Sequence, residues 1–418
     1  MGEDEAVADD REYDLVLYGA SGFVGALTAA HLAEHAPPEA RIALAGRSAE
    51  KLAAVRDRLP AAAHGWPLVE ADATDPASLA ALAAAAQVVV TTVGPYARYG
   101  LPLVEACAAA GTHYADLTGE VLFVRQAIDR GDAAARGTGA KIVHSCGYDS
   151  VPSDLAVLLL HERAAADGAG ELRDVRLVAT ARGGFSGGTV ASILGQIDAL
   201  RHDPAARRAT ADPFALSPDR AAEPDTPQPP DAARPARAAD GSWTAPFVMA
   251  PFNTRIVRRS NAVTGWVYGR DLRYGEVMGT GAGPLGAAGA VAATGGLVAA
   301  LGALSFPPTR ALLDRVLPAP GTGPDAATRE KGWFRSVVHA TTADGRRYRA
   351  EVSGPGDPGY AATAVMLGES GLALAGAPGP SDGDLPDRSG SLTPATALGL
   401  PLVERLRAAG HTYTVAPA

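Results

Sequence analysis

Cysteine is scarce in this sequence of 418 residues, in which only Cys107 and Cys146 occur. Two cysteines cannot form a disulfide framework or a cysteine-rich zinc site. The nine histidines are scattered along the chain, and we predict no metal site from them. Chemistry that depends on disulfides or on a protein-bound metal is therefore not expected.

Lysine is also scarce, because the 37 basic residues include only Lys51, Lys141 and Lys331. The residues four positions before these lysines are Arg47, Gly137 and Ala327. None of them is tyrosine, which excludes the Tyr-x-x-x-Lys mechanism of short-chain dehydrogenases, and so few lysines argue against Schiff-base chemistry. Cys146 has no histidine in an evident supporting position, so we interpret it as a buried structural thiol rather than a nucleophile.

Positive charge is outnumbered by negative charge. The 37 Lys and Arg residues against 46 Asp and Glu residues give a net charge of −9, which disfavours a nucleic-acid partner. The N-terminal stretch MGEDEAVADDREYD lacks the basic start and the apolar run of a secretory signal, so we expect a cytoplasmic protein. With 47% hydrophobic residues the composition is globular, and at about 150 residues per domain the length predicts two or three domains.

The first 155 residues alternate between short apolar runs and helical stretches. We expect strands at 14–18, 41–46, 68–71, 87–94, 113–117 and 140–145. Helices are expected between them, ending near Glu34 and then over 49–59, 76–85, 101–110 and 120–137. This alternation predicts βαβ units, and thus an α/β fold with a Rossmann-type parallel-sheet domain over 1–155.

The pattern changes beyond residue 155, and we expect an inserted α+β substrate domain over 156–380. Its expected elements are a strand at 172–182, helices at 187–201 and 359–376, and a β-hairpin at 335–353. The segment 203–245 is dense in Pro, Ala, Asp and Arg, and we interpret it as a mobile loop or linker. Residues 381–418 are expected to return a C-terminal helix, near 394–409, to the Rossmann domain.

One long segment, 277–309, contains no charged residue. Its length would allow a membrane span, but the dominant Gly and Ala and three prolines contribute little insertion energy. Our first interpretation is a buried or tunnel-lining helix. The alternatives are a segment in peripheral contact with a membrane or lipid surface and a true span.

A glycine-rich motif follows the first apolar strand directly. It reads Gly19-Ala20-Ser21-Gly22-Phe23-Val24-Gly25 and opens a helical pattern. In a dinucleotide site the first glycine permits the tight turn, the second lets the backbone approach the pyrophosphate, and the third lets the helix pack close to the strand. The helix start then presents N–H groups to the phosphates. We predict that these seven residues bind a dinucleotide.

The cofactor preference is indicated by the end of the second predicted strand. NAD-preferring sites usually carry an acidic residue there, whereas this chain has Arg47, followed by Ser48 and, one turn later, Lys51. A guanidinium suits a 2′-phosphate, so we expect NADP(H), with the plain alternative that Arg47 is a solvated helix-start residue. Asp72, after the third strand, either meets the adenine or caps a helix or turn. The residues expected on the nicotinamide side are Gly94, Pro95 and Tyr96.

A series of segments resembles a known family. In order they are YDLVLYGASGFVG, RIALAGRS, TTVGPYARYG, HYADLTGE, CGYDSVPSD, KGWFR, DPGYAATAVMLGES and SLTPATALG. Together they resemble the saccharopine dehydrogenase-like oxidoreductases and, within them, the actinobacterial trans-acting enoyl reductases. The resemblance implies a Rossmann domain with an inserted α/β domain, a pyridine nucleotide, and reduction of a C=C bond in an acyl, polyketide or lipid-like substrate. It implies a carrier- or lipid-bound substrate, and a homodimer is compatible with it.

Candidate catalytic residues follow from that chemistry, which needs a hydride at the β-carbon, an electrophile at the carbonyl oxygen and a proton at the α-carbon. We select Tyr96, Asp149 and Asp116, which follow strand ends, and note Tyr148 and Glu120 beside them. The plain alternatives are packing for Tyr96 and helix capping for Asp149. Two other functions stay open: a saccharopine-type C–N reductase or dehydrogenase, and a non-catalytic NADP-binding, lipid-associated protein.

Overall fold

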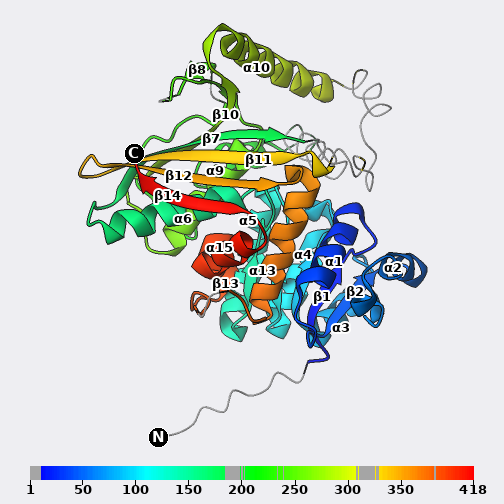
Figure 1. Cartoon of the computed structure of the whole chain (residues 1–418). Helices are drawn as coiled ribbons and strands as arrows, with labels where there is room; N and C mark the ends of the chain where they lie inside the picture. The colour runs from blue at the N-terminus through cyan, green and yellow to red at the C-terminus, as the bar shows by residue number, and fades with distance from the viewer. Residues whose placement is uncertain are drawn as a thin grey trace, which may run out of the picture.

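The computed structural model describes residues 11–183, 198, 201, 203–232, 234–238, 240–306, 309, 325, 329–380 and 383–418. Two β-sheets with their helices form the described part of the chain (Figure 1). The helix expected at 187–201 lies outside the described residues, apart from residues 198 and 201.

The first sheet has seven parallel strands in the order β13-β6-β5-β4-β1-β2-β3. These strands are β1 (Tyr13–Tyr18), β2 (Ile42–Gly46), β3 (Leu68–Glu70), β4 (Ala86–Thr91), β5 (His113–Ala115), β6 (Lys141–Val143) and β13 (Gly390–Leu392). The helices that alternate with them are α1 (Phe23–His35), α2 (Ala49–Arg56), α3 (Pro76–Ala85), α4 (Tyr96–Ala110), α5 (Val121–Thr138) and α6 (Val151–Ala166), with a short 3₁₀ turn at Ala61–Ala63. The order reverses between β1 and β4, as in a Rossmann fold, so the predicted α/β class is confirmed.

The second sheet is mixed, in the order β14-β12-β11-β7-β10-β9-β8. Its strands are β7 (Leu172–Arg182), β8 (Ala236–Arg237), β9 (Trp243–Pro246), β10 (Arg273–Gly281), β11 (Trp333–Thr342), β12 (Arg347–Pro355) and β14 (Thr412–Pro417). The pair β7–β10 is parallel and the other pairs are antiparallel. The predicted hairpin is present as β11 and β12, whose turn uses Gly345 at φ 88°.

The remaining helices lie in the second half of the chain, among the strands of the second sheet and around β13. They are α8 (Pro204–Ala211), α9 (Ala250–Val263), α10 (Gly283–Ser305), a π-helical turn at Pro358–Ala362, α13 (Thr363–Leu374), α14 (Pro394–Ala397) and α15 (Gly399–Ala408). Helix α6 packs against β7, β11 and β12, whereas α13 packs against α1 and β4. The hydrophobic core is therefore continuous from the first sheet to the second.

The expectation of a mobile loop over 203–245 is wrong for its described residues. Helix α8, strands β8 and β9, and the fully buried Leu216 lie in this segment. Three arginines of α9 hold it in place, because Arg255, Arg258 and Arg259 donate to its carbonyl oxygens. These guanidinium groups satisfy the irregular backbone that a Pro-rich sequence leaves without partners.

The expectation of a buried helix within 277–309 is also wrong. Among the described helices and strands, α10 has its main contacts with β9 and β10, and it lies on the side of the second sheet away from the first (Figure 1). Leu285 is 87% exposed and Val298 is 66% exposed. Among the described helices, Gly283–Leu304 is long and apolar enough to cross a membrane.

The C-terminal residues contribute to both sheets. Strand β13 pairs with β6 of the first sheet, and β14 pairs with β12 of the second. The single helix expected at 394–409 is two helices, which meet at Leu398, and Gly399 there has φ 57°. Helix α15 packs against α13 and α6, so the C-terminal stretch binds the two sheets together rather than returning as one helix.

Candidate functional site

The glycine-rich turn forms a cradle that no larger residue could form. Gly19 has φ 89°, and a Cβ added there would lie 2.7 Å from Oγ1 of Thr92. A Cβ on Gly25 would lie 2.2 Å from the carbonyl oxygen of Gly19. Gly22 precedes α1 and has no side chain over the helix start, which leaves the first N–H groups facing outward. The cradle therefore fits a pyrophosphate group.

The other residues of the motif complete this turn. Ala20 is fully buried, Ser21 is exposed, and Phe23 and Val24 are partly buried. The ring of Phe23 packs edge-on against Tyr360, 4.7 Å between centroids, and the guanidinium of Arg329 lies over the same ring. The start of α1 is thus held by residues on both sides of the β11–β12 hairpin, since Arg329 precedes the hairpin and Tyr360 follows it.

Arg47 extends from the carboxyl end of β2, beside the glycine cradle. Its side chain is exposed, and its guanidinium has no hydrogen-bond or ion-pair partner among the described residues. Lys51 is exposed one turn further on, and Ser48 caps α2 by accepting a hydrogen bond from the Lys51 N–H. Two exposed cations at this position are what a 2′-phosphate requires.

Asp72 follows β3 and faces the same region. Its carboxylate accepts hydrogen bonds from the N–H and the hydroxyl of Thr74, at 2.8 Å each. These bonds, helped by the positive charge of Arg47, lower its pKa. Asp72 therefore stabilises a turn, which is the alternative to adenine binding given above. It also lies beside the region predicted for the adenosine.

Tyr96 opens α4 behind the Gly94–Pro95 cis peptide bond. Its ring is buried against Phe123, and its hydroxyl donates to the carbonyl oxygen of Thr91 at 3.0 Å. Burial raises the pKa of this hydroxyl well above its usual range. Glu120 accepts hydrogen bonds from the N–H groups of Tyr96 and Ala97 at the start of the helix. The hydroxyl of Tyr96 thus has a structural contact, which argues against its predicted catalytic role.

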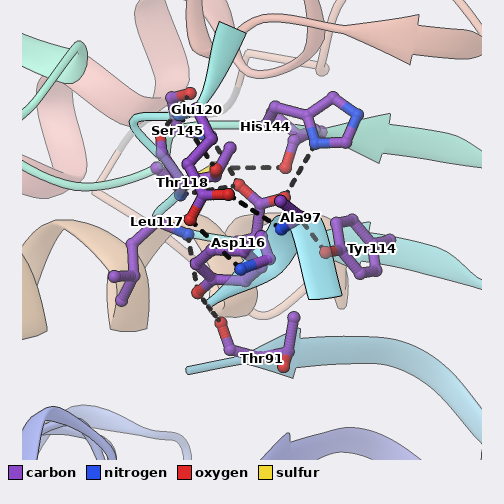
Figure 2. A network of polar contacts seen from close by, with 12 residues as sticks. Thr91, Ala97, Tyr114, Asp116, Leu117, Thr118, Glu120, His144 and Ser145 are labelled. Atoms are coloured by element: carbon purple, nitrogen blue, oxygen red, sulfur yellow. Dashed lines mark hydrogen bonds and ion pairs between the residues drawn. The ribbon is translucent and has the colours of Figure 1, made fainter. Parts of the chain in front are cut away.

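Asp116 is the centre of a buried polar network, which Figure 2 shows. Its carboxylate accepts from the hydroxyl of Tyr114 at 3.0 Å and from the N–H groups of Thr118 and Ser145. Nδ1 of His144 lies 2.7 Å from the same carboxylate. All four contacts are internal and the side chain is fully buried, which favours a structural role for Asp116 at the ends of β5 and β6 over its predicted catalytic role.

The chain after β6 turns sharply because of this network. Ser145 has φ 67°, a conformation that a non-glycine residue adopts at some cost. The Asp116 carboxylate bonds its N–H, and its hydroxyl donates to the carbonyl oxygen of Thr118. Cys146 follows, and burial raises the pKa of its thiol, so the expected buried position of this cysteine is confirmed.

Asp149 stands at the end of this turn, immediately before α6. Its Oδ2 lies 3.4 Å from the position of a Cβ on Gly119, so the carboxyl lies against the segment that follows β5. The methyl group of Met249 closes the same space from the start of α9. Burial raises the pKa of Asp149 to about 7, and among the described residues its carboxyl has no hydrogen-bond partner. Ser150, not Asp149, is the residue at the start of the helix, so the capping alternative does not hold.

Tyr148 is the neighbour of Asp149. Its ring packs edge-on against Phe334 of the second sheet. Its hydroxyl is buried without a hydrogen-bond partner among the described residues, and burial raises its pKa, so it stays protonated. The charges of Glu276 and Asp149 both act on it.

Glu276 was not predicted from the sequence. It lies on β10, is 2% exposed, and accepts from the hydroxyl of Tyr274 at 2.7 Å and from the amide of Asn253 at 2.9 Å. Asn253 in turn accepts from the hydroxyl of Ser150, next to Asp149. Burial raises the pKa of Glu276 to about 7. A charged residue within the apolar pattern of a strand was the signal that could have identified it.

The histidines do not form a metal centre in the described part of the chain. His31 and His35, four residues apart on α1, stack ring on ring at 4.1 Å. Nε2 of His31 bonds to Glu369, which also pairs with Arg405. Among the described residues no three His, Cys, Asp or Glu side chains gather as metal ligands would.

Comparisons with known proteins agree with this geometry. Residues 15–143 match the saccharopine dehydrogenase NADP binding domain, so the cofactor of this domain is NADP(H). A saccharopine dehydrogenase (L-Glu forming) from Saccharomyces cerevisiae aligns with a TM-score of 0.52 at 13% identity, over 96% of this chain and 99% of the yeast chain. At that identity the likeness shows the fold alone.

Relatives in mycobacteria are much closer in sequence. A Mycobacterium tuberculosis protein (strain H37Rv), provisionally named a trans-acting enoyl reductase, is 54% identical over 96% of this chain and 97% of its own length. The trans-acting enoyl reductase of Mycobacterium ulcerans is 50% identical over the same shares of the two chains. Such identity over almost the whole length shows the family, and this chain belongs to the trans-acting enoyl reductases, as an oxidoreductase with an NADP-binding domain.

Proposed function

We propose that this protein reduces the C=C bond of an enoyl acyl substrate with NADPH, acting on a chain carried by a separate synthase or carrier. The single observation that carries the proposal is Asp149, a carboxyl with no partner among the described residues and a pKa near 7, at the carboxyl edge of the NADP-binding sheet. An acid that holds its proton near neutral pH suits the transfer of a proton to the substrate α-carbon.

The cofactor is held by the first sheet. The cradle of Gly19, Gly22 and Gly25 receives the pyrophosphate, and Arg47 with Lys51 binds the 2′-phosphate. When bound, NADPH supplies a hydride to the β-carbon of the substrate. Gly94 and Pro95, at the end of β4, border the nicotinamide side of the site.

The substrate is activated by residues after β6. The hydroxyl of Tyr148, which stays protonated and has no partner among the described residues, is available to donate a hydrogen bond to the carbonyl oxygen of the substrate. Asp149 then donates its proton to the α-carbon. Asp116 orients the ends of β5 and β6, and Glu120 orients the start of α4. We assign neither of them a contact with the substrate.

The test is NADPH oxidation with a 2-enoyl thioester of N-acetylcysteamine, followed for wild type, Asp149→Asn and Tyr148→Phe. We expect at least a 100-fold loss of kcat for Asp149→Asn and about a 10-fold loss for Tyr148→Phe, with NADPH binding retained. Asp57→Asn, an exposed carboxyl on the surface, is the matched control and should keep full activity.

The pH profile distinguishes proton donation by Asp149 from a purely structural effect of its substitution. Because Asp149 acts in its protonated form, kcat/KM should fall as the pH rises through about 7, and Asp149→Asn should remove that limb. Full activity of Asp149→Asn would refute its assignment as the proton donor. Turnover of imines or amino acids, with none of enoyl thioesters, would favour the C–N alternative instead.

A further inference from the structure

Helix α10 presents apolar side chains to solvent over most of its length. Leu285 is 87% exposed, Val291 64%, Val298 66% and Leu301 43%. Phe306, which follows the helix, is 58% exposed. Elsewhere in the described chain the large exposed apolar side chains are single residues, namely Val267, Trp333 and Leu400. An apolar surface of this extent on one element indicates an interaction site.

The apolar surface of α10 is not confined to one face. Its first half rests on β9 and β10, where Gly286 packs against the ring of Trp243 and Ala290 is buried. From residue 298 to residue 302 every residue is exposed. A protein partner covers one face of a helix, whereas lipid surrounds all of them, and a helix that is apolar all round is stable only when something apolar encloses it.

The dimensions and the charge agree with a lipid environment. Gly283–Leu304 is apolar, and its later part, from Val291 to Leu304, is about 20 Å long at about 1.5 Å per residue, which is enough to enter the roughly 15 Å of hydrocarbon in one leaflet. No charged residue lies between 277 and 309. At the base of the helix, Trp243 pairs across β8 and β9 with the exposed Arg237, and these are residue types that membrane proteins place at the headgroup level.

We propose that α10 is a lipid-docking helix, which enters one leaflet of a bilayer with its free end and holds the second sheet at the membrane surface. Spanning is disfavoured, because the contacts with β9 and β10 would bring the polar edges of these strands into the hydrocarbon. The proposal does not depend on the reaction. It gives an enzyme of acyl chains direct access to substrates that reside in lipid.

The experiment is flotation of the full-length protein with phosphatidylcholine vesicles. The wild type should float with the vesicles, also in 1 M NaCl, because apolar insertion is insensitive to salt. The double substitution V298D/L301D should lower the bound fraction at least about tenfold, since aspartate is costly in hydrocarbon. Leu400→Asp places the same charge on an exposed leucine of α15, and this matched control should float like the wild type.

Three results would overturn the proposal: a wild type that stays at the bottom of the gradient, a double variant that floats unchanged, or binding that high salt abolishes.

Light scattering tests whether a second copy of the chain, rather than lipid, covers α10. A wild-type dimer that V298D/L301D converts to monomers, without flotation of either, would assign α10 to a dimer interface. Turnover of a soluble thioester, measured without vesicles, is expected to be equal for wild type and V298D/L301D. A failure of lipid docking is therefore distinguishable from a failure of the proposed reaction.

Discussion

Nδ1 of His144 lies 2.7 Å from Oδ2 of Asp116, and both side chains are buried at the ends of the neighbouring strands β5 and β6. A carboxylate only accepts hydrogen bonds, so Nδ1 carries the proton of the imidazole. The other nitrogen, Nε2, is buried without a partner in the described part of the chain. This pair holds the turn that leads to Tyr148 and Asp149, and we therefore expect Asp116 to act as a positioning residue.

The first prediction concerns Asp116→Asn. An amide cannot accept every bond that the carboxylate accepts from Tyr114, Thr118, Ser145 and His144, so we expect a loss of about 2–4 kcal/mol in the free energy of unfolding. Urea denaturation measures it, with the exposed Asp129→Asn as control. Unchanged stability combined with lost turnover would instead make Asp116 a catalytic residue.

The second prediction concerns the cofactor preference. Arg47→Ala removes the exposed guanidinium beside the cradle, so affinity for NADPH should fall about 10- to 100-fold while affinity for NADH is unchanged. Fluorescence titration with both nucleotides measures the two affinities. Arg58→Ala, an exposed arginine beyond the end of α2, is the control. An equal loss of affinity for NADPH and NADH would show that Arg47 does not recognise the 2′-phosphate.

The third prediction compares two helical glycines. Gly25→Ala places a methyl group 2.2 Å from the carbonyl oxygen of Gly19, so the turn must shift, and we expect about 1–3 kcal/mol of destabilisation with weakened NADPH binding. Gly137→Ala on α5 meets nothing within 4 Å and should stabilise the protein by about 0.5–1 kcal/mol. Thermal unfolding with and without NADPH distinguishes them. If Gly25→Ala and Gly137→Ala changed the unfolding temperature and NADPH binding in the same way, the close packing of α1 against the Gly19 turn would be contradicted.

The fourth prediction concerns pH and stability. The pKa of Glu276 is raised to about 7 in the folded chain, so the folded state holds a proton that the unfolded state releases above about pH 4. Stability should therefore fall as the pH rises from 5 to 7, by up to about 1 kcal/mol per pH unit from this group. Glu276→Gln should flatten that slope in urea titrations. A slope equal to that of the wild type would mean that Glu276 is ionised throughout.

Local features of the site could be predicted from the sequence. The cradle of Gly19, Gly22 and Gly25 follows a strand and opens a helix within a few residues, and steric rules for glycine translate directly into geometry. The position of Arg47 directly after β2 could also be predicted, because an apolar run of neighbouring residues marks the end of that strand. Such features depend on neighbours in the chain, which a single sequence contains.

Features that depend on distant contacts could not be predicted. Asp116 and Asp149 both follow strand ends, and only burial separates the fully bonded carboxylate from the one without a described partner. Strand β13 has three residues and pairs with β6, far away in the sequence. The apolar composition of 277–309 predicts a helix, yet it does not say whether protein, solvent or lipid surrounds it.

Transfer of deuterium from NADPH labelled at C4 to a 2-enoyl thioester, in light water, with the product analysed by NMR, tests enoyl reduction most directly. We expect one deuterium at the β-carbon, one solvent proton at the α-carbon, and a rate that Asp149→Asn reduces at least about 100-fold. Absence of deuterium from the acyl chain, under conditions where NADPH is bound, would contradict enoyl reduction by this protein.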